Sequence, residues 1–253
     1  MAKIIAFTNQ KGGVGKTTCC INLASCVAEK GKKVLLIDLD PQSNTTSGLG
    51  LSQTDKLSIY EVLTKDAPID DNVICPTEVQ GLDCITSSVG LAGAELELAS
   101  VFGRESILKI ALQPILDRYD FIFIDCPPSL GTLTVNALTA CNSIIIPMQC
   151  EYYALEGLSQ LTRTIQGLKK FLNPTITIEG IILTMYDKRS NLTSQVYDEI
   201  KKFFGEKLYD SVIPRNVRLA EAPSYGQPII IYDKNCKGSK AFKALATEFL
   251  QKQ

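Results

Sequence analysis

The sequence predicts an α/β fold, a doubly wound and mostly parallel twisted sheet with helices on both faces. Short apolar runs alternate with helix-like patterns along all 253 residues, and this alternation is typical of parallel sheets. The runs are rich in β-branched residues and continuously apolar, as strands covered on both faces should be. No Pro/Ser-rich linker, low-complexity tract or internal repeat divides the chain. We therefore expect one domain spanning residues 1–253.

The strands and helices can be assigned in order along the chain. The expected strands are Lys3–Thr8, Val34–Leu39, Leu82–Thr86, Phe121–Asp125, Ser143–Met148, Ile176–Met185 and Leu208–Ile213. The expected helices lie near Thr17–Lys30, Glu105–Arg118, Leu130–Ala140, Leu155–Phe171, Gln195–Phe204 and Ser239–Gln251. Ser43–Gly50, which is rich in Ser, Thr, Asn and Gly, is interpreted as a functional loop. Because ligands of open α/β sheets bind beyond the carboxyl ends of the strands, we expect the functional motifs there.

The composition excludes several kinds of site. Acidic and basic residues nearly balance at a net charge of −1, which argues against a highly basic nucleic-acid packaging protein. Histidine is absent, so a histidine general base, a Ser-His-Asp triad and a histidine-bearing zinc site are excluded. With no histidine available, a carboxylate is a sensible choice for positioning water.

Cysteine usage and the N-terminus favour a soluble cytoplasmic protein. The nine cysteines include no Cys-x-x-Cys pair and most stand in apolar runs, as buried small residues do in a reducing cytosol. Met1–Phe7 passes straight into a glycine-rich loop and leaves no room for a signal peptide. No apolar stretch approaches the roughly 20 residues that span a bilayer. The cysteines are Cys19, Cys20, Cys26, Cys75, Cys84, Cys126, Cys141, Cys150 and Cys236.

A glycine- and lysine-rich segment, Asn9–Thr18, follows the first expected strand and opens the first expected helix. Glycines let backbone N–H groups curl around phosphate oxygens, and the helix N-terminus adds the positive end of its dipole. Lys16 is expected to reach the β- and γ-phosphates, and the Thr17 hydroxyl to ligate Mg²⁺. The sequence therefore predicts a P-loop that binds ATP or ADP with Mg²⁺. The nucleotide-binding residues of this loop are Lys11, Gly12, Gly13, Val14, Gly15, Lys16, Thr17 and Thr18.

One position departs from the ordinary P-loop pattern. Gln10 stands where the usual motif has its first glycine, and a second lysine, Lys11, stands at the front of the loop. A solvated loop lysine is the alternative reading, but Lys-Gly-Gly-x-Gly-Lys-Thr-Thr resembles the deviant Walker A motif. That family includes the partition ATPases ParA and Soj, the division regulator MinD and the nitrogenase iron protein. The resemblance implies an ATP-bound homodimer in which Lys11 crosses to the partner's phosphates, as an arginine finger does. Gly12 and Gly13 would allow the close approach.

Two apolar runs end in carboxylates. Val34–Gln42 contains Asp38 and Asp40, which strand alternation places on one side, and a plain Asx-Pro turn is the alternative reading. After a P-loop the run resembles the family's Asp-x-Asp-Pro-Gln motif. This implies that Asp40 orients or activates the attacking water and that Asp38 supports the magnesium–water shell. Phe121–Ser129 is interpreted as Walker B, with Asp125 holding Mg²⁺ through a water.

Stretches outside the nucleotide motifs resemble the ParA/Soj branch across nearly the whole chain. They are Gly93–Glu95, Ala137–Thr139, Cys150–Gly157 and Pro214–Ser224. The resemblance implies that Pro214, Asn216 and Val217 border the adenine base. It also implies that the ATP-bound dimer binds double-stranded DNA non-specifically, that a DNA-bound ParB-type partner stimulates hydrolysis, and that the protein is cytoplasmic and nucleoid-associated. The replicon, chromosome or plasmid, stays open.

Basic loop residues are the candidates for DNA contact. Lys188 and Arg189 follow one expected strand, and Arg218 lies in a later loop. Arg189 and Arg218 match basic positions that the family uses for DNA, whereas solvated surface charges are the alternative reading. If a monomer offers about 2–4 phosphate contacts, dimerisation doubles that number and steepens the salt dependence in proportion. Further basic residues in these and neighbouring loops are Arg215, Lys234, Lys237 and Lys240.

Three other functions fit parts of the sequence. A MinD-like membrane-associated ATPase of cell division needs an amphipathic anchor. Ala241–Leu250 has the spacing, but a core-facing helix has the same stripe, so we expect no stable membrane association. A metabolic ATP-dependent synthetase needs reactive groups beyond the ATP site, which we do not recognise. An iron–sulfur reductase needs cysteines at the dimer face, whereas most of these lie in core runs.

Overall fold

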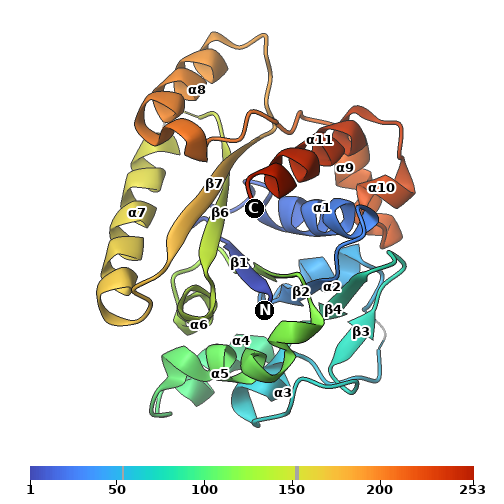
Figure 1. Cartoon of the computed structure of the whole chain (residues 1–253), viewed down its shortest axis with the longest axis vertical. Coiled ribbons are helices and arrows are strands. Elements are labelled where there is room, and N and C mark those ends of the chain that lie inside the picture. The colour runs from blue at the N-terminus through green and yellow to red at the C-terminus, as the bar shows by residue number, and fades with distance from the viewer. Residues whose placement is uncertain (53, 152–153) are drawn as a thin grey trace.

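A seven-stranded sheet forms the centre of the structure, in the order β3-β4-β2-β5-β1-β6-β7 (Figure 1). The structure is a computed structural model that describes residues 1–52, 54–151 and 154–253. β3 pairs antiparallel with β4, whereas the other neighbouring strands pair in parallel. The predicted mostly parallel sheet is therefore confirmed. The strands are β1 (Lys3–Phe7), β2 (Val34–Asp38), β3 (Ile74–Pro76), β4 (Leu82–Ile85), β5 (Phe121–Asp125), β6 (Ser143–Gln149) and β7 (Thr177–Thr184).

Helices cover both faces of the sheet, as the doubly wound prediction requires (Figure 1). Alternate strand residues point to opposite faces, so Ile4 and Ala6 of β1 join one core while Ile5 and Phe7 join the other. Helices α3 to α8 pack on the first core, and α1 and α11 on the second. The longer helices are α1 (Lys16–Glu29), α4 (Leu91–Leu98), α6 (Thr132–Ala140), α7 (Ala154–Phe171), α8 (Asn191–Phe204) and α11 (Lys237–Gln251). The shorter ones are α2 (Asn44–Gly48), α3 (Ile59–Thr64), α5 (Ile107–Leu112), α9 (Val217–Glu221) and α10 (Ile229–Tyr232).

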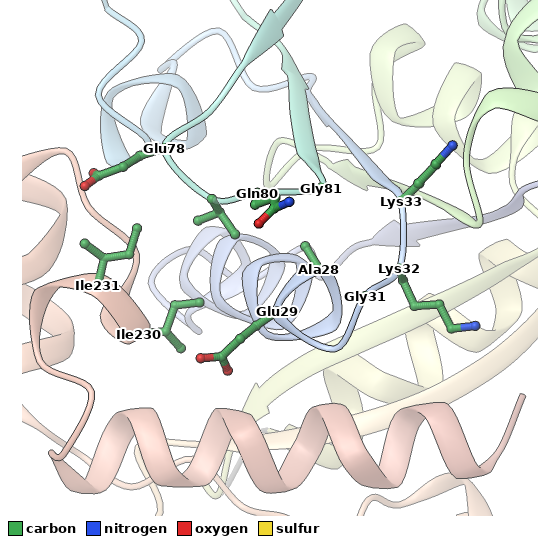
Figure 2. A pocket seen from close by; sticks show the side chains of 11 residues that line it. Ala28, Glu29, Gly31, Lys32, Lys33, Glu78, Gln80, Gly81, Ile230 and Ile231 are labelled. Atoms are coloured by element: carbon green, nitrogen blue, oxygen red, sulfur yellow. The ribbon is translucent and has the colours of Figure 1, made fainter.

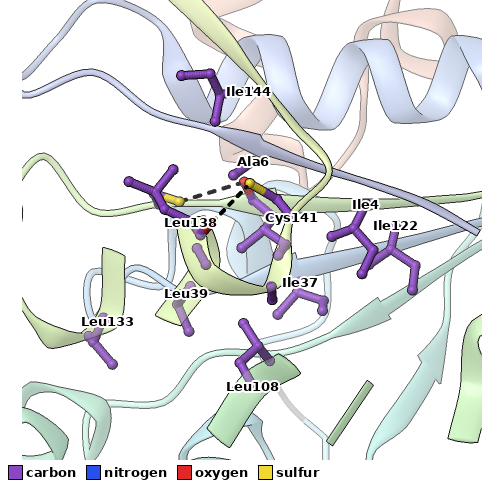
Figure 3. Packing of buried hydrophobic residues seen from close by; sticks show 14 of the residues in the cluster. Ile4, Ala6, Ile37, Leu39, Leu108, Ile122, Leu133, Leu138, Cys141 and Ile144 are labelled. Atoms are coloured by element: carbon purple, nitrogen blue, oxygen red, sulfur yellow. Dashed lines mark hydrogen bonds between the residues drawn. The ribbon is translucent and has the colours of Figure 1, made fainter. Parts of the chain in front are cut away.

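Aliphatic side chains fill the core beneath α5 and α6 (Figure 3). Ile37 of β2 and Ile122 of β5 lie among Leu108 of α5 and Leu133 and Leu138 of α6, all of them buried. Burying one such side chain contributes about 1.5–3 kcal/mol. This packing holds the carboxyl ends of β2 and β5, which carry the predicted carboxylates, in a fixed position.

Aromatic rings tie α11 to the opposite face of the sheet. The ring of Phe249 lies 5.2 Å from that of Phe121 and 5.8 Å from that of Phe123, and Phe123 lies 5.4 Å from Phe7. Phe242 and Phe249 are both fully buried. The apolar stripe of Ala241–Leu250 therefore faces the protein core, which is the alternative that competed with a membrane anchor. Among the described residues, no helix combines the length and the apolar character needed to cross a membrane.

The predicted strand Leu208–Ile213 is wrong. Leu208 forms only an isolated bridge to Ile181 of β7, and Pro214 another to Tyr186. The amides of Asp210 and Ser211 donate instead to the carboxylate of Glu248 on α11, at 2.9 Å each. Because these donors are taken by a side chain from a distant helix, the backbone ladder is interrupted and no strand forms.

Several short elements also differ from the prediction. The expected loop Ser43–Gly50 contains α2, and the expected helix Glu105–Arg118 is split into α5 and two 3-10 turns, η1 (Arg104–Ser106) and η2 (Gln113–Arg118). Strand β3 and helices α3 and α4 were not expected. Helix α3 does carry a local signal, because Ser58 and Glu61 form a capping box at its start. The remaining 3-10 turns are η3 (Gly205–Lys207) and η4 (Ala222–Tyr225).

The cysteines lie mainly in the interior, as predicted. Cys150 and Cys236 are partly exposed, and the other cysteines are buried. Burial raises the pKa of the Cys150 thiol to about 11 and that of Cys141 to about 12. These thiols therefore pack as small apolar groups at neutral pH.

A partly buried ion pair joins Lys3 of β1 to Glu179 of the edge strand β7, and it predicts an acid-sensitive stability. Glu179 of β7 accepts hydrogen bonds from Ser143 at 2.6 Å and Lys3 at 3.0 Å. Burial alone raises the pKa of Glu179, but these bonds and one from Gln253 outweigh it and hold the pKa below its ordinary value. A lowered pKa means that this stabilisation is present above the unfolded pKa and is lost as pH falls through the folded pKa.

Glu179→Gln is therefore expected to lower the free energy of unfolding by about 1–3 kcal/mol at neutral pH, with the difference shrinking below about pH 4. Urea denaturation between pH 3 and pH 7 measures this. Glu206→Gln, at an exposed carboxylate, is the control and should change little. A deficit that stayed constant across the pH range would show that charge plays no part.

Candidate active site

The glycine-rich loop between β1 and α1 is held open by neighbouring strands. Gly13 and Gly15 have φ values of 72° and 83°, in the left-handed region that favours glycine. Two carbonyl groups of the loop are held by side chains of β6 and β7. Gln149 Nε2 donates to the Gly13 oxygen, and Thr184 Oγ1 donates to the Val14 oxygen, each at 2.8 Å. With these carbonyls bonded outward, the loop keeps the curled conformation that a P-loop uses to present N–H groups to phosphate.

Lys16 lies inside the loop rather than on its surface. Its side chain is buried at 7% exposure, and Nζ lies 3.4 Å from the carbonyl oxygen of Lys11. Burial lowers the pKa of Lys16, whereas the nearby carboxylates of Asp125 and Asp40 favour its charged form. The ammonium and the two carboxylates therefore lie close enough to interact electrostatically.

Asp125 ends β5 directly beside Asp38, its register partner on β2. Its side chain is fully buried, and Oδ2 accepts a hydrogen bond from Thr45 Oγ1 at 2.8 Å. Burial raises the pKa of Asp125 to about 6, although hydrogen bonds from Thr17 and Thr45 oppose the rise. The other oxygen, Oδ1, has no partner among the described residues. A buried carboxylate oxygen without a partner, close to a threonine hydroxyl, fits a magnesium ion and its waters.

Asp38 has its carboxylate occupied by the protein itself. Oδ2 accepts from the Thr46 amide at 2.8 Å and the Thr46 hydroxyl at 2.7 Å, and Oδ1 accepts from the Asp40 amide at 3.2 Å. Burial, with the nearby charge of Asp125, raises the pKa of Asp38 to about 7. Asp38 thus fixes the start of α2 and the backbone of Asp40, and any contact with a metal shell runs through these neighbours.

Asp40 lies one step further out than Asp38 and is 7% exposed. Its Oδ1 accepts from the Gln42 amide at 3.0 Å, and its backbone oxygen accepts from Ser87 Oγ at 2.7 Å. The strand ends at Asp38, so this turn, not the pleat, orients the Asp40 carboxylate. The site therefore gathers Asp40, Asp125 and Lys16 near the carboxyl ends of β2 and β5, close enough for both carboxylates to favour the charged form of Lys16.

A small apolar pocket of about 190 Å³ adjoins the P-loop. Its lining combines Gly15 and Thr18 of the loop with Pro214 and Asn216 from the predicted adenine segment. Val217, the third residue of that prediction, does not line the pocket and is 71% exposed. The pocket has the size and apolar character expected for one face of a base.

Lys11 stands at the exposed front of the loop. Its Nζ contacts the carboxylate of Glu151, which follows β6, and the two side chains are 49% and 47% exposed. Its backbone amide donates to Asn9 Oδ1 at 3.0 Å. Tyr152 and Tyr153, which continue the Cys150–Gly157 stretch, lie outside the described residues.

The comparisons with known proteins agree with this geometry. A sequence model of the AAA domain family matches residues 2–178. The chain is 55% identical over 249 residues to the sporulation initiation inhibitor protein Soj of Bacillus subtilis, with 98% of each chain covered. It is 49% identical over 253 residues to the chromosome partitioning protein ParA of Myxococcus xanthus, covering 100% of this chain and 89% of that one. The chain belongs to the ParA/Soj family of partition ATPases.

A solved relative has the same fold with a nucleotide in place. Cobyrinic acid a,c-diamide synthase of Mycobacterium smegmatis, with bound ADP and magnesium, matches with a TM-score of 0.85 and 34% identity. The match covers 99% of this chain and 95% of that chain. ParA/Soj proteins thus share their architecture with a protein named as a synthase, and the site residues must distinguish the two functions.

The basic residues predicted to contact DNA lie in two adjacent loops of this ParA/Soj chain. Tyr186 bonds backbone to backbone with Ile213 at 3.0 Å, and the charge of Arg215 helps to lower the pKa of Asp187, so the two loops run side by side. Arg189 is 91% exposed and forms a two-pronged pair with Asp187 at 3.0 Å. Lys188 is exposed as well.

Arg218 was expected in a loop but lies on helix α9, which follows the second loop, and it is also engaged within the chain. It pairs with Glu221 at 2.9 Å and lies 3.6 Å from Asp233. The structure thus places Lys188 and Arg189 in the loop after β7 and Arg218 on α9, which follows the neighbouring segment. Both arginines are already partnered by carboxylates, so DNA phosphates would have to replace those partners.

Several site residues were missed by sequence reasoning. Thr45 and Thr46 of α2 bond to Asp125 and Asp38, and Ser87 bonds to both Thr46 and Asp40. The Ser/Thr-rich character of Ser43–Gly50 was the available signal, although it did not show which carboxylates the hydroxyls would meet. Their role is to hold the acidic residues in place.

A second cavity of about 500 Å³ lies at the opposite, amino-terminal edge of the sheet (Figure 2). Gly31, Lys32 and Lys33 line it just before β2, and Gly81 lines it just before β4. It contains none of the predicted site residues, so the nucleotide chemistry belongs to the carboxyl-end cavity.

Proposed function

We propose that this chain is a partition ATPase that dimerises with ATP, binds double-stranded DNA non-specifically as the dimer, and leaves DNA after hydrolysis. The observation that carries the proposal is the second lysine. Lys16 is buried among the carboxylates, whereas Lys11 projects from the front of the same loop. One protomer has no evident use for two phosphate-directed lysines, but a facing protomer does.

The catalytic roles follow from the positions of the side chains. Lys16 holds the β- and γ-phosphates from inside the loop, and Lys11 of the facing protomer adds a second positive charge as the γ-phosphate leaves. Asp40 orients the attacking water, because the turn that fixes its carboxylate lies beside Lys16. With no histidine in the chain, a carboxylate is a sensible choice for positioning water.

Mg²⁺ and nucleotide complete the site. Thr17 and the unpartnered oxygen of Asp125 hold the metal and its waters, and Asp38 supports this shell by fixing Thr46 and Asp40. When bound, Mg²⁺ neutralises charge on the phosphate oxygens. Gly15, Thr18, Pro214 and Asn216 border the base, with Val217 outside the pocket. The remaining loop residues, Gly12, Gly13 and Val14, supply backbone contacts to the phosphates.

The biological setting is inferred from the family. We expect a DNA-bound ParB-type partner to stimulate a slow intrinsic hydrolysis, and the protein to be cytoplasmic, nucleoid-associated and without stable membrane association. Residues 1–253 are proposed to act as one domain, which the shared sheet and the two cores on its faces support. The function is segregation of a chromosome or a plasmid.

Binding to random-sequence duplex DNA at physiological salt, with ATP, with ADP and without nucleotide, tests the proposal. We expect binding only with ATP, because the dimer doubles the phosphate contacts of the monomer. Equal affinity with ADP and ATP would show that dimerisation does not gate DNA binding. Sedimentation in the same buffers reports the oligomeric state independently.

Arg189→Glu is expected to abolish most DNA binding while leaving ATP-dependent dimerisation intact. Losing one contact per protomer removes two from the dimer, which reduces the slope of log affinity against log salt by about 2. Arg163→Glu, an equal charge change at an exposed position on α7, is the control. If both variants lost DNA binding to the same extent, net charge rather than this loop would be responsible.

An ATP-dependent synthetase is the second candidate, and one observation favours it. A pocket of about 520 Å³ lined by hydroxyl side chains, among them Thr46, Ser58 and Ser87, lies next to the Asp40 turn. A synthetase would place an acyl substrate there, beside the γ-phosphate. Hydrolysis that depends on DNA and a partner protein supports partition, whereas hydrolysis that depends on a small carboxylic acid supports the synthetase.

A further inference from the structure

Glu151 pairs with Lys11, the side chain that the proposed dimer needs. Lys11 must reach the phosphates of a facing protomer, yet in this chain its ammonium group contacts the Glu151 carboxylate. Glu151 follows β6 and belongs to none of the nucleotide motifs. The contact is therefore made within one protomer and has to be broken when Lys11 crosses to another.

The end of β6 also holds the backbone of the loop that carries Lys11. Asn9 Nδ2 donates to the Pro147 oxygen at 2.8 Å, and Asn9 Oδ1 accepts from the Lys11 amide at 3.0 Å. Gln149 Nε2 donates to the Gly13 oxygen at 2.8 Å on the other side of Lys11. The backbone on both sides of Lys11 is thus anchored to the strand that ends next to Glu151.

In this arrangement the backbone of Lys11 is held in place, whereas its side chain can move. The backbone anchors keep the Lys11 Cα in place, so the Lys11 side chain alone can exchange partners by rotating about its own bonds. The Lys11 side chain is 49% exposed, so it has solvent into which it can rotate. Exchange of Glu151 for an outside anion therefore requires no rearrangement of the loop.

We propose that Glu151 is a counter-ion that holds Lys11 within its own protomer and sets the threshold for ATP-dependent dimerisation. The inference rests on the proposed dimer. In the monomer Glu151 neutralises the charge of Lys11. When two protomers meet without ATP, Lys11 is therefore not free to stabilise their contact. A nucleoside triphosphate bound to the facing protomer outcompetes the Glu151 carboxylate for Lys11, because the triphosphate carries more negative charge.

The strength of the Lys11–Glu151 contact determines how much the dimer dissociation constant should change when Glu151 is neutralised. Both side chains are about half exposed, at 49% and 47%, so the pair is a surface ion pair. Removing one such pair changes an equilibrium by roughly 1.4- to 5-fold, and a symmetric dimer breaks two of them. The dimer dissociation constant with ATP should therefore fall by about 2- to 30-fold when Glu151 is neutralised.

Glu151→Gln tests this, with Glu156→Gln as the matched control. Glu156 lies in the first turn of α7 and is exposed, so the control makes the same chemical change close by in the sequence. Sedimentation with saturating ATP and Mg²⁺ gives the dissociation constant of each dimer. We expect Glu151→Gln to dimerise at lower protein concentration than Glu156→Gln, and the difference to shrink as NaCl is raised from about 0.05 M to 0.5 M.

The outcomes separate the inference from the proposed function. If the wild-type chain does not dimerise with ATP, the proposed function fails and Glu151 has no dimer to regulate. If the wild type dimerises but Glu151→Gln and Glu156→Gln have equal constants, the inference alone is overturned. Weaker dimerisation of Glu151→Gln also overturns it, because Glu151 would then bond across the interface.

Discussion

Replacing Asp40 with alanine is expected to leave ATP binding intact and to arrest the protein as an ATP-bound dimer. The charge of Asp40 is near enough to favour the charged form of Lys16, but Asp40 does not line the base pocket. Loss of a positioned base slows a reaction on the order of 10²- to 10⁴-fold. Hydrolysis should fall by that amount while dimerisation with ATP persists.

The structure shows how to separate this chemical role from a structural one. Asp40 Oδ1 also accepts a hydrogen bond from the Gln42 amide at 3.0 Å, and alanine removes that bond. Asp40→Asn keeps an oxygen for Gln42 while removing the charge, at a cost of at most about 1 kcal/mol in stability. Both variants should lose hydrolysis if the carboxylate acts on water, whereas only alanine should lose it if the turn is what matters.

Single-turnover hydrolysis and sedimentation with ATP measure the two effects. In the wild type the dimer should disappear as ATP is consumed, and in the Asp40 variants it should remain. A variant that stayed monomeric with saturating ATP would contradict the assigned role, because it would place Asp40 in nucleotide binding or in the interface.

The nucleotide motifs were predictable because their function is local in the chain. The P-loop is a contiguous segment between one strand and one helix, so its glycines and Lys16 can be recognised from their spacing in the sequence. Asp38 and Asp125 end two apolar runs, and β2 and β5 turn out to be neighbours with these residues in register. A carboxylate at the end of a buried strand can therefore be recognised without knowing which distant residues it contacts.

The residues that support the site were not predictable in the same way. Thr45 reaches Asp125 across 80 positions of sequence, and Glu151 reaches Lys11 across 140. Nothing in the local pattern of either partner specifies the other. Such contacts depend on how strands are ordered in the sheet, where β1 lies between β5 and β6.

The failed strand Leu208–Ile213 has the same cause. Its apolar residues are buried as the pattern requires, with Leu208 at 2% and Ile213 at 3% exposure. What the pattern does not contain is Glu248, which takes two amides of the segment from a helix near the end of the chain. Burial was correctly predicted, while the partner of the backbone was not.

Lys16→Ala is expected to abolish nucleotide binding by the monomer, and with it every later step. Lys16 is only 7% exposed, burial lowers its pKa, and the carboxylates of Asp125 and Asp40 favour its charged form. Removing one partner of such a buried charged contact costs about 2–5 kcal/mol, which weakens binding by about 30- to 5000-fold. Isothermal titration with ADP and Mg²⁺ measures the loss directly.

Lys11→Ala is the matched control, because it is the same truncation in the same loop. Lys11 is half exposed and pairs with Glu151 at the front of the loop, so this variant should bind ADP as a monomer with nearly unchanged affinity. It should nevertheless fail to form the ATP-bound dimer. Equal losses of ADP affinity in both variants would contradict the division of labour between the two lysines. A loss of ADP affinity confined to Lys16→Ala would establish that this lysine serves its own nucleotide, and loss of the ATP-bound dimer in Lys11→Ala despite intact ADP binding would assign Lys11 to the partner's.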